Sequence, residues 1–207
     1  MLQKAKPAVI HFSDDTIRWQ GQTVFVGKLD NEVVIVKASY MTLTTDGATG
    51  EIRACDRTAQ AETALRGPVG KPIDANAIPY LVLPWCGGAA DRKKCKAHPP
   101  YRQLGLQMGD LAAVITGEKI AFAIAADLGP EKRFGEGSIE LHRRLGHETI
   151  GKDPADPRCA KNESLNSEVV LVIFPGSNDR WLPADELEKK GRALWNRLLQ
   201  EGKVLSE

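Results

Sequence analysis

The amino-acid sequence predicts a mostly β protein, a small barrel of six strands with one short inserted helix and one C-terminal helix. The strand-like runs are short and rich in β-branched residues, which is typical of small closed barrels. Helical patterns follow too few of these runs to cover the faces of an α/β sheet. With 207 residues, 42% of them apolar and 27% charged, the chain is expected to form one globular domain over residues 1–207.

Each of the six predicted strands is five to eight residues long. Residues 23–29 alternate apolar and polar side chains, whereas residues 33–38 form a nearly continuous apolar run. Two of the later runs are separated only by Gly117-Glu118, which indicates a hairpin. The predicted strands are residues 23–29, 33–38, 79–83, 111–116, 119–126 and 169–174.

Two helices are expected. Ser138 is a suitable N-cap for a short helix that ends near Leu145, with Gly146 as its terminator. A second helix is predicted over residues 183–200, with Pro183 near its first turn. The apolar residues of this second helix recur at helical spacing, so we expect them to pack on the barrel; an exposed face that binds a partner is the alternative.

The charge pattern argues against two classes of partner. A formal net charge of +1 gives no global attraction to nucleic acid or to an anionic membrane, so neither is expected. The densest basic run is Arg92-Lys93-Lys94 followed by Lys96, and we expect it to be a solvated loop. No apolar run approaches the ~20 residues of a membrane-spanning helix. The chain is expected to be a monomer.

The chain contains four cysteines: Cys55, Cys86, Cys95 and Cys159. An even number suits an exported protein with two disulfides, and four cysteines allow three pairings. Cys86 and Cys95 flank a short loop and are the first pair that we expect to be bonded. We expect neither a metal nor a cofactor, because no close Cys-x2-Cys pair exists and the histidines form no i, i+4 pair. His142, on the short helix, is expected at the surface.

Two carboxylates occupy positions that suit catalysis. Asp127 directly follows the apolar run 119–126, and the chain is expected to turn at Gly129-Pro130. Glu136 lies between two glycines, just ahead of the Ser138 cap. Glycoside cleavage requires two such carboxyls, one to protonate the leaving oxygen and one to activate water or attack carbon. The alternative is structural: a solvated strand-end carboxylate, and a glutamate favoured by the dipole of the following helix.

Several short motifs occur in an order and spacing that resemble the chitosanases of glycoside hydrolase family 75. They are Asp46-Gly47-Ala48 and the stretches 78–84, 109–114, 126–130 and 135–139, with 170–176 similar to the family's last barrel strand. The resemblance covers residues 24–176, which we take as the core of the domain. The Asp-x-Gly-Pro stretch at 127–130 also resembles double-psi β-barrels of the expansin and lytic transglycosylase kind. A double-psi barrel is therefore the expected fold.

The resemblance also implies an inverting mechanism, with the family's paired acids at Asp127 and Glu136. It implies Glu136 as the proton donor and Asp127 as the base. A helix N-terminus lowers the pKa of a nearby carboxyl, whereas a general acid needs a raised pKa. Burial of Glu136 against Phe134 or Ile139 would have to compensate.

A cationic polysaccharide is expected to meet acidic and aromatic side chains. Asp46, Asp56 and Asp110 are candidates to pair with ammonium groups, and Tyr80 and Trp181 are candidates to stack on sugar faces.

The sequence thus predicts endo-hydrolysis of β-1,4 bonds in chitosan or a related aminosugar polymer. Two alternatives remain: an enzyme acting on peptidoglycan or chitin, and a non-catalytic, expansin-like carbohydrate-binding barrel. The polymer substrate and the cysteine count predict a secreted or cell-envelope protein. Residues 1–15 lack the apolar core of a signal peptide, so a cytoplasmic location is the alternative.

Overall fold

A computed structural model describes residues 11–12, 17–19, 22–29, 33–50, 52, 59–87, 92–97, 99–130, 133–149 and 164–201. Its strands are β1 (His11–Phe12), β2 (Ile17–Trp19), β3 (Gln22–Leu29), β4 (Val33–Ala38), β5 (Met41–Thr44), β6 (Tyr80–Gly87), β7 (Leu111–Thr116), β8 (Lys119–Pro130), β9 (Glu136–Ser138), β10 (Ser164–Leu165) and β11 (Val169–Phe174). Its helices are the 3-10 turn η1 (Pro68–Gly70), α2 (Arg92–Ala97), α3 (Pro100–Gln103), α4 (Ile139–Arg144) and α5 (Ala184–Gln200).

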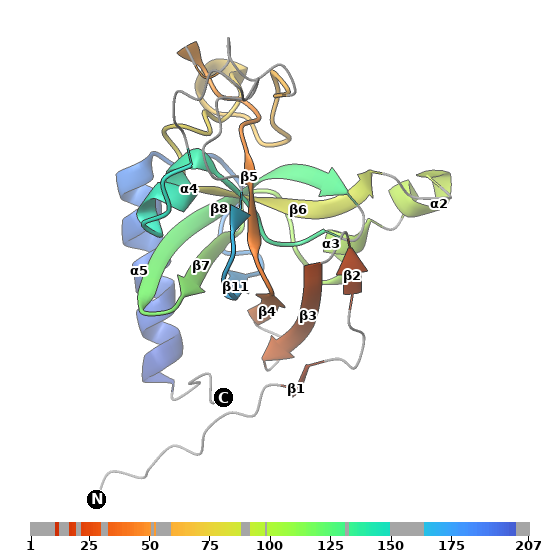
Figure 1. The fold of residues 1–207 in the computed structure, drawn as a ribbon, viewed down its shortest axis with the longest axis vertical. Helices are drawn as coiled ribbons and strands as arrows, with labels where there is room; N and C mark the ends of the chain where they lie inside the picture. Colours follow the sequence, from red (N-terminus) through yellow and green to blue (C-terminus); the bar gives the residue numbers. More distant parts are fainter. Residues whose placement is uncertain are drawn as a thin grey trace, which may run out of the picture.

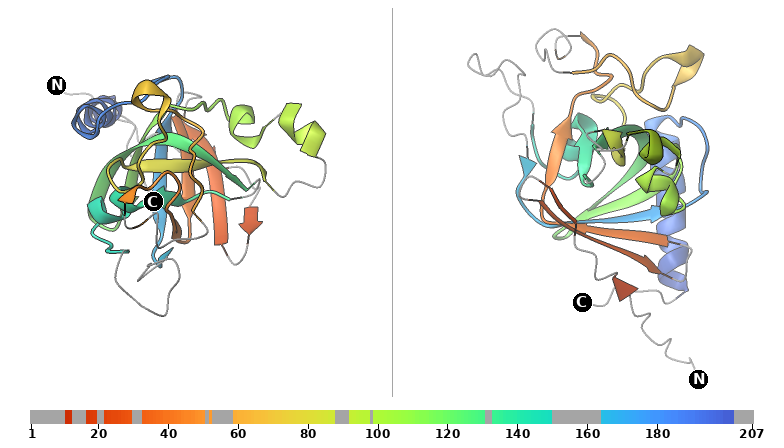
Figure 2. Two further views of the ribbon diagram at one scale, coloured as in Figure 1. Left: turned by 90° about the horizontal axis from the view of Figure 1, so that it is seen from above. Right: turned by 90° about the vertical axis from the view of Figure 1, so that its right-hand side faces the viewer.

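These strands form one curled, mixed sheet with the order β1-β3-β4-β11-β7-β8-β6-β9-β5-β10, and β2 pairs with β3 (Figures 1 and 2). Most pairs are antiparallel, but β6 runs parallel to β8 and β5 runs parallel to β9. The six predicted strands are confirmed as β3, β4, β6, β7, β8 and β11, and β7 and β8 form the predicted hairpin.

The prediction of a closed, six-stranded double-psi barrel was wrong. Over the described residues, the path of paired strands ends at β1 and β10, which do not pair with each other, so the sheet is a half-barrel. The prediction missed β5 and β9, which add further strands beyond β6. These strands are too short to show a period of two, and Glu-Gly-Ser in β9 has the composition of a turn.

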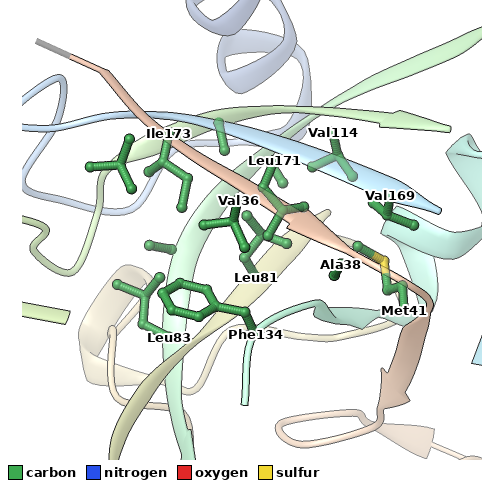
Figure 3. Close-up of a cluster of buried hydrophobic side chains, with 14 of the residues drawn as sticks. Val36, Ala38, Met41, Leu81, Leu83, Val114, Phe134, Val169, Leu171 and Ile173 are labelled. Atoms are coloured by element: carbon green, nitrogen blue, oxygen red, sulfur yellow. The ribbon is translucent and has the colours of Figure 1, made fainter. Parts of the chain in front are cut away.

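The sheet curls around one apolar cluster. Val36 of β4 and Leu81 of β6 belong to the same buried cluster, although three strands separate β4 from β6 in the sheet. Figure 3 shows side chains from these strands meeting those of Val114 and Leu171, with Phe134 at the same cluster. Burial of each such side chain contributes about 1.5–3 kcal/mol, so this contact between distant strands holds the half-barrel in its curved form.

A second cluster lies on the other face, where α5 packs against β7 and β8 (Figure 1). The predicted C-terminal helix is confirmed to within one residue, with Pro183 as its N-cap. Leu187 and Leu198 are buried against the sheet, as the leucine spacing predicts. None of the described helices is long and apolar enough to span a membrane.

The short predicted helix is confirmed as α4, and Ser138 also joins it to the sheet. The Ser138 hydroxyl accepts the N–H groups of Leu141 (3.2 Å) and Tyr80 (3.0 Å) and donates to the Ile78 carbonyl (2.8 Å). One buried side chain thus connects α4 to the start of β6. The expectation for His142 was wrong: its ring is fully buried, with Nε2 3.1 Å from the carbonyl oxygen of Thr42, because α4 packs on β5.

The basic run is a helix rather than the expected loop. Arg92–Ala97 forms α2, on the opposite side of the molecule from α5 (Figures 1 and 2), with the side chains of Lys93 and Lys96 exposed. The expected disulfide between Cys86 and Cys95 is confirmed and attaches this helix to the end of β6. The two other cysteines, at positions 55 and 159, lie outside the described residues.

Gly191 allows α5 to approach the sheet closely. A Cβ atom at this position would lie 2.7 Å from Cβ of Phe122, nearer than van der Waals contact permits. Glycine inside a helix normally costs about 1 kcal/mol relative to alanine. We therefore predict that Gly191→Ala, unlike an ordinary glycine-to-alanine change in a helix, destabilises the fold by about 1–3 kcal/mol, because α5 must move away from β8.

Urea denaturation of the wild type, Gly191→Ala and the exposed-site control Lys189→Ala would test this. The control is expected to unfold near the wild-type midpoint. A Gly191→Ala protein that is as stable as the wild type, or more stable, would contradict the close packing of α5 on Phe122.

Candidate active site

A β-bulge in β8 positions Asp127. Leu81 of β6 pairs with Ala125, and the next residue, Val82, pairs with Asp127, so that Ala126 is an extra residue in β8. The carbonyl of Ala126 instead accepts the N–H of Leu65 at 2.8 Å. A bulge of this kind redirects the side chain that follows it. The strand also continues to Pro130, so the predicted turn at Gly129-Pro130 was wrong, because pairing with β6 extends the strand.

The Asp127 carboxyl is nearly enclosed, with 8% of the residue exposed. Its Oδ1 accepts the N–H of Ala64 at 3.0 Å. Burial raises the pKa of Asp127 to about 6; hydrogen bonds from the backbone at Leu128 and Ala64 oppose this rise, and the charge of Asp46 adds to it. Desolvation therefore outweighs the hydrogen bonds, and Asp127 titrates well above an ordinary aspartate.

Glu136 is the first residue of β9 and leaves 16% of its side chain exposed. Burial raises the pKa of Glu136 from 4.5 to about 7. Nη1 of Arg133 lies 3.7 Å from Oε2 of Glu136 and opposes the rise, whereas Asp46 and Asp127 increase it. We expected the dipole of the following helix to lower the pKa of Glu136. Instead its pKa is raised, because Glu136 lies on a strand and burial is the largest effect on it.

The two carboxyls flank Val82, a buried residue of β6. Val82 pairs with Asp127 on one side, and the Leu81–Gly137 pairing places it beside Glu136 on the other. Two strand spacings separate β8 from β9, about 10 Å between their backbones. The buried, apolar side chain of Val82 thus comes from the strand position between the two carboxyls.

The Glu136 side chain extends toward Gly129 of β8. A Cβ atom at position 129 would lie 3.6 Å from Oε2 of Glu136 and only 2.8 Å from Cγ1 of Val82. Glycine at this position therefore leaves room for the carboxyl. Residues 127 and 129 point to the same face of the strand and are about 7 Å apart, so Oε2 of Glu136 lies two residues along the strand from Asp127.

Asp46 and Tyr80 complete the cluster. The Tyr80 ring is fully buried, and its hydroxyl donates to the main-chain carbonyl of Asp46 at 2.7 Å. Burial raises the pKa of Tyr80, and the charges of Asp127, Asp46 and Glu136 raise it further. The phenol is therefore close enough to all three carboxyls to feel their charges, which places two of the predicted binding residues near the predicted catalytic pair.

One segment fixes two of these carboxylates together. The N–H of Gln60 donates to Oδ1 of Asp46 at 2.6 Å, and the N–H of Ala64 donates to Asp127. Within this segment, the buried Thr63 hydroxyl donates to the carbonyl of Leu65 and accepts the N–H of Ile73, both at 2.8 Å. Residues 60–65 thus hold Asp46 and Asp127 at a fixed separation.

The structure does not bring the other predicted binding residues to this cluster. Asp110 is fully buried at the start of β7, where Oδ2 accepts the N–H of Gln107 at 2.8 Å, and burial raises the pKa of Asp110 to about 6. Trp181 is partly buried against the second apolar cluster, beside Gly67. Asp56 lies outside the described residues.

Sequence reasoning missed two residues of the site, Arg133 and Thr42. Nη2 of Arg133 donates to Oγ1 of Thr42 at 3.0 Å, and Thr42 is the register partner of Glu136 in the β5–β9 pair. No local pattern indicated either residue, because Arg133 precedes a strand and meets Thr42 only through the pairing of β5 with β9. In the part of the chain that the structure describes, no group of three or more His, Cys, Asp or Glu side chains is arranged to hold a metal ion.

Comparison with known proteins gives a family. The family model described as "Fungal chitosanase of glycosyl hydrolase group 75" matches residues 41–204, most of the chain. The matched range begins at the first residue of β5 and includes Asp46, Asp127 and Glu136. No curated protein matches the chain.

The raised pKa of Glu136 predicts a gain in stability when its charge is removed. Between pH 4.5 and about 7 the folded chain binds more protons at Glu136 than the unfolded chain does, so this residue's contribution to stability falls as pH rises through that range. We predict that Glu136→Gln raises the free energy of unfolding by about 1–3 kcal/mol at pH 8, and by almost nothing near pH 4.5.

Denaturant unfolding at several pH values would measure this difference, with Glu118→Gln at the exposed hairpin turn as the control. The control is expected to show no such pH-dependent gain. A Glu136→Gln protein that is less stable than the wild type at pH 8 would contradict the desolvation of Glu136.

Proposed function

This chain belongs to glycosyl hydrolase group 75 and is a glycoside hydrolase of the chitosanase kind, and we propose that it cleaves internal β-1,4 bonds of chitosan or a related aminosugar polysaccharide by inversion. One observation carries the mechanism: two carboxyls flank Val82, and burial raises the pKa of each, to about 6 for Asp127 and about 7 for Glu136. Acid and base catalysis near neutral pH requires carboxyls whose pKa values are raised above the ordinary range.

The burial of Glu136 supports Glu136 as the acid and Asp127 as the base, because it raises the pKa of Glu136 from 4.5 to about 7 and so favours the protonated form that a general acid needs. Glu136 donates its proton to the glycosidic oxygen, which leaves with the electron pair of the bond to the anomeric carbon. Asp127 takes a proton from a water molecule, whose oxygen bonds to that carbon from the opposite face. The product is a hemiacetal of inverted configuration and a free hydroxyl on the leaving chain.

The placement of the carboxyls supports inversion. Oε2 of Glu136 lies beside Gly129, and Asp127 is two residues earlier on the same face of β8, where such positions are about 7 Å apart. Inverting glycosidases keep their carboxyls roughly 6.5–9.5 Å apart, which leaves room for the attacking water, whereas retaining enzymes need about 5–5.5 Å.

Negative charge supports a cationic substrate. Asp46 raises the pKa values of both Asp127 and Glu136, and Asp127 raises that of Glu136, so the site gathers carboxyls that a positively charged glucosamine unit would stabilise. We assign Asp46 to ammonium binding. Because Tyr80 is fully buried, we do not assign it to stacking on a sugar; its hydroxyl instead donates to the main-chain carbonyl of Asp46.

We infer that the chain forms one catalytic domain, because α5 packs on the sheet that carries the site. We also infer export, because the Cys86–Cys95 disulfide would persist in an oxidising compartment. The polysaccharide is the partner that the site requires.

We predict that Asp127→Asn and Glu136→Gln each lower the turnover of highly deacetylated chitosan at least about 100-fold, because each removes a proton-transfer group. Release of reducing ends at mildly acidic pH would measure this, with Glu118→Gln as a control of full activity and thermal unfolding as a check on folding. Near-wild-type turnover by either variant would refute the pair. No release by the wild type, with retained chitosan binding, would indicate a carbohydrate-binding module instead, and cleavage of peptidoglycan or chitin alone would indicate the neighbouring enzyme.

A further inference from the structure

Arg133 is held beside Glu136 by a residue that also pairs with Glu136. Its Nη1 lies 3.7 Å from Oε2 of Glu136, and its Nη2 donates to Oγ1 of Thr42 at 3.0 Å. Thr42 is the parallel-sheet partner of Glu136, and its N–H donates to the carbonyl of Gly135 at 2.9 Å. With 23% of the Arg133 side chain exposed, the guanidinium is partly shielded from water.

A third contact fixes Thr42 from the opposite side. Nε2 of the fully buried His142 ring lies 3.1 Å from the Thr42 carbonyl oxygen. Burial lowers the pKa of His142 to about 4, so the ring is neutral at higher pH and donates one hydrogen bond through Nε2. Thr42 is therefore held by β9, by α4 and by Arg133, and the guanidinium has little freedom to leave Glu136.

The groups that face Glu136 come from several elements. Asp127 on β8 and Asp46, just after β5, are anionic when ionised, whereas the buried Tyr80 of β6 is neutral. Arg133 is the cation among the groups that act on Glu136 in the described part of the chain. Among the same residues it forms an ion pair with Glu136 and none with Asp127, so its charge acts mainly on one carboxyl of the pair.

We propose that Arg133 is a positioning residue for the proton donor: it directs Oε2 of Glu136 toward the guanidinium, leaves Oε1 for the sugar, and stabilises the carboxylate formed when the proton leaves. The inference rests on the proposed function. As the proton passes from Oε1 to the glycosidic oxygen, negative charge develops on the carboxyl beside a cation already in place.

Arg133→Met tests this by removing the charge while keeping most of the side-chain length, and Arg133→Lys restores a charge without the planar fork. Carbon NMR titration of the Glu136 carboxyl reports its protonation without any substrate. Loss of the cation makes the proton harder to remove, so the Glu136 midpoint is expected to rise by ~1 pH unit in Arg133→Met and by less in Arg133→Lys. The Asp127 midpoint is expected to stay within a few tenths of a unit.

Chitosan hydrolysis provides the second readout. The limb of kcat/KM that falls with rising pH is expected to move to higher pH in Arg133→Met by the same amount, with a maximum kcat ~10-fold lower. Arg102→Met, which removes an exposed arginine on α3, is the control for loss of one positive charge and is expected to change neither quantity.

An unchanged Glu136 midpoint in Arg133→Met would overturn the proposal, as would an equal shift in Arg102→Met. The titration also separates the two proposals. If the Glu136 midpoint shifts but the wild type does not cleave chitosan, the role of Arg133 is supported and the proposed substrate is refuted. If the wild type cleaves chitosan but the midpoint does not shift, the substrate is supported and the role of Arg133 is refuted. Arg133→Lys keeps the test open if Arg133→Met does not fold.

Discussion

Strand β6 pairs with β8 on one side and with β9 on the other, and the site depends on this double pairing. The first pairing contains the bulge that aims Asp127, and the second brings Glu136 to the far side of Val82. Neither carboxyl would be buried without its neighbouring strand. Because burial is the largest effect on the pKa of both residues, the same arrangement of strands produces both the geometry and the acid–base properties of the site.

Desolvation of these carboxyls opposes folding at neutral pH, so other parts of the fold must offset it. Two apolar clusters, one inside the curled sheet and one beneath α5, supply the largest favourable contribution. Local contacts then fix the charged groups: residues 60–65 donate to Asp46 and Asp127, and Thr42 contacts Arg133 beside Glu136. The site thus destabilises the fold locally, and the surrounding core offsets this destabilisation, as is common for catalytic sites.

Elements with a local signal could be predicted from the sequence, and elements that depend on distant partners could not. The apolar runs of β4 and β7, the Ser138 cap and the leucine spacing of α5 are local patterns, and all were confirmed. Strands β5 and β9 exist because segments far apart in the sequence pair with each other, and three or four residues carry too little pattern to indicate this. The catalytic candidates could be named, but the bulge at Ala126, the burial of Asp110 and the contact between Arg133 and Thr42 arise only in the folded chain.

Inverting hydrolysis requires Asp127 and Glu136 to act across a gap wide enough for water. Proton NMR of a chitosan oligosaccharide during the first minutes of cleavage tests it most directly, because it detects hydrolysis and the configuration of the new reducing end together. We expect the α-anomer to appear first and then to mutarotate, as inversion at a β linkage requires. Initial formation of the β-anomer, or no cleavage of the oligosaccharide, would contradict it.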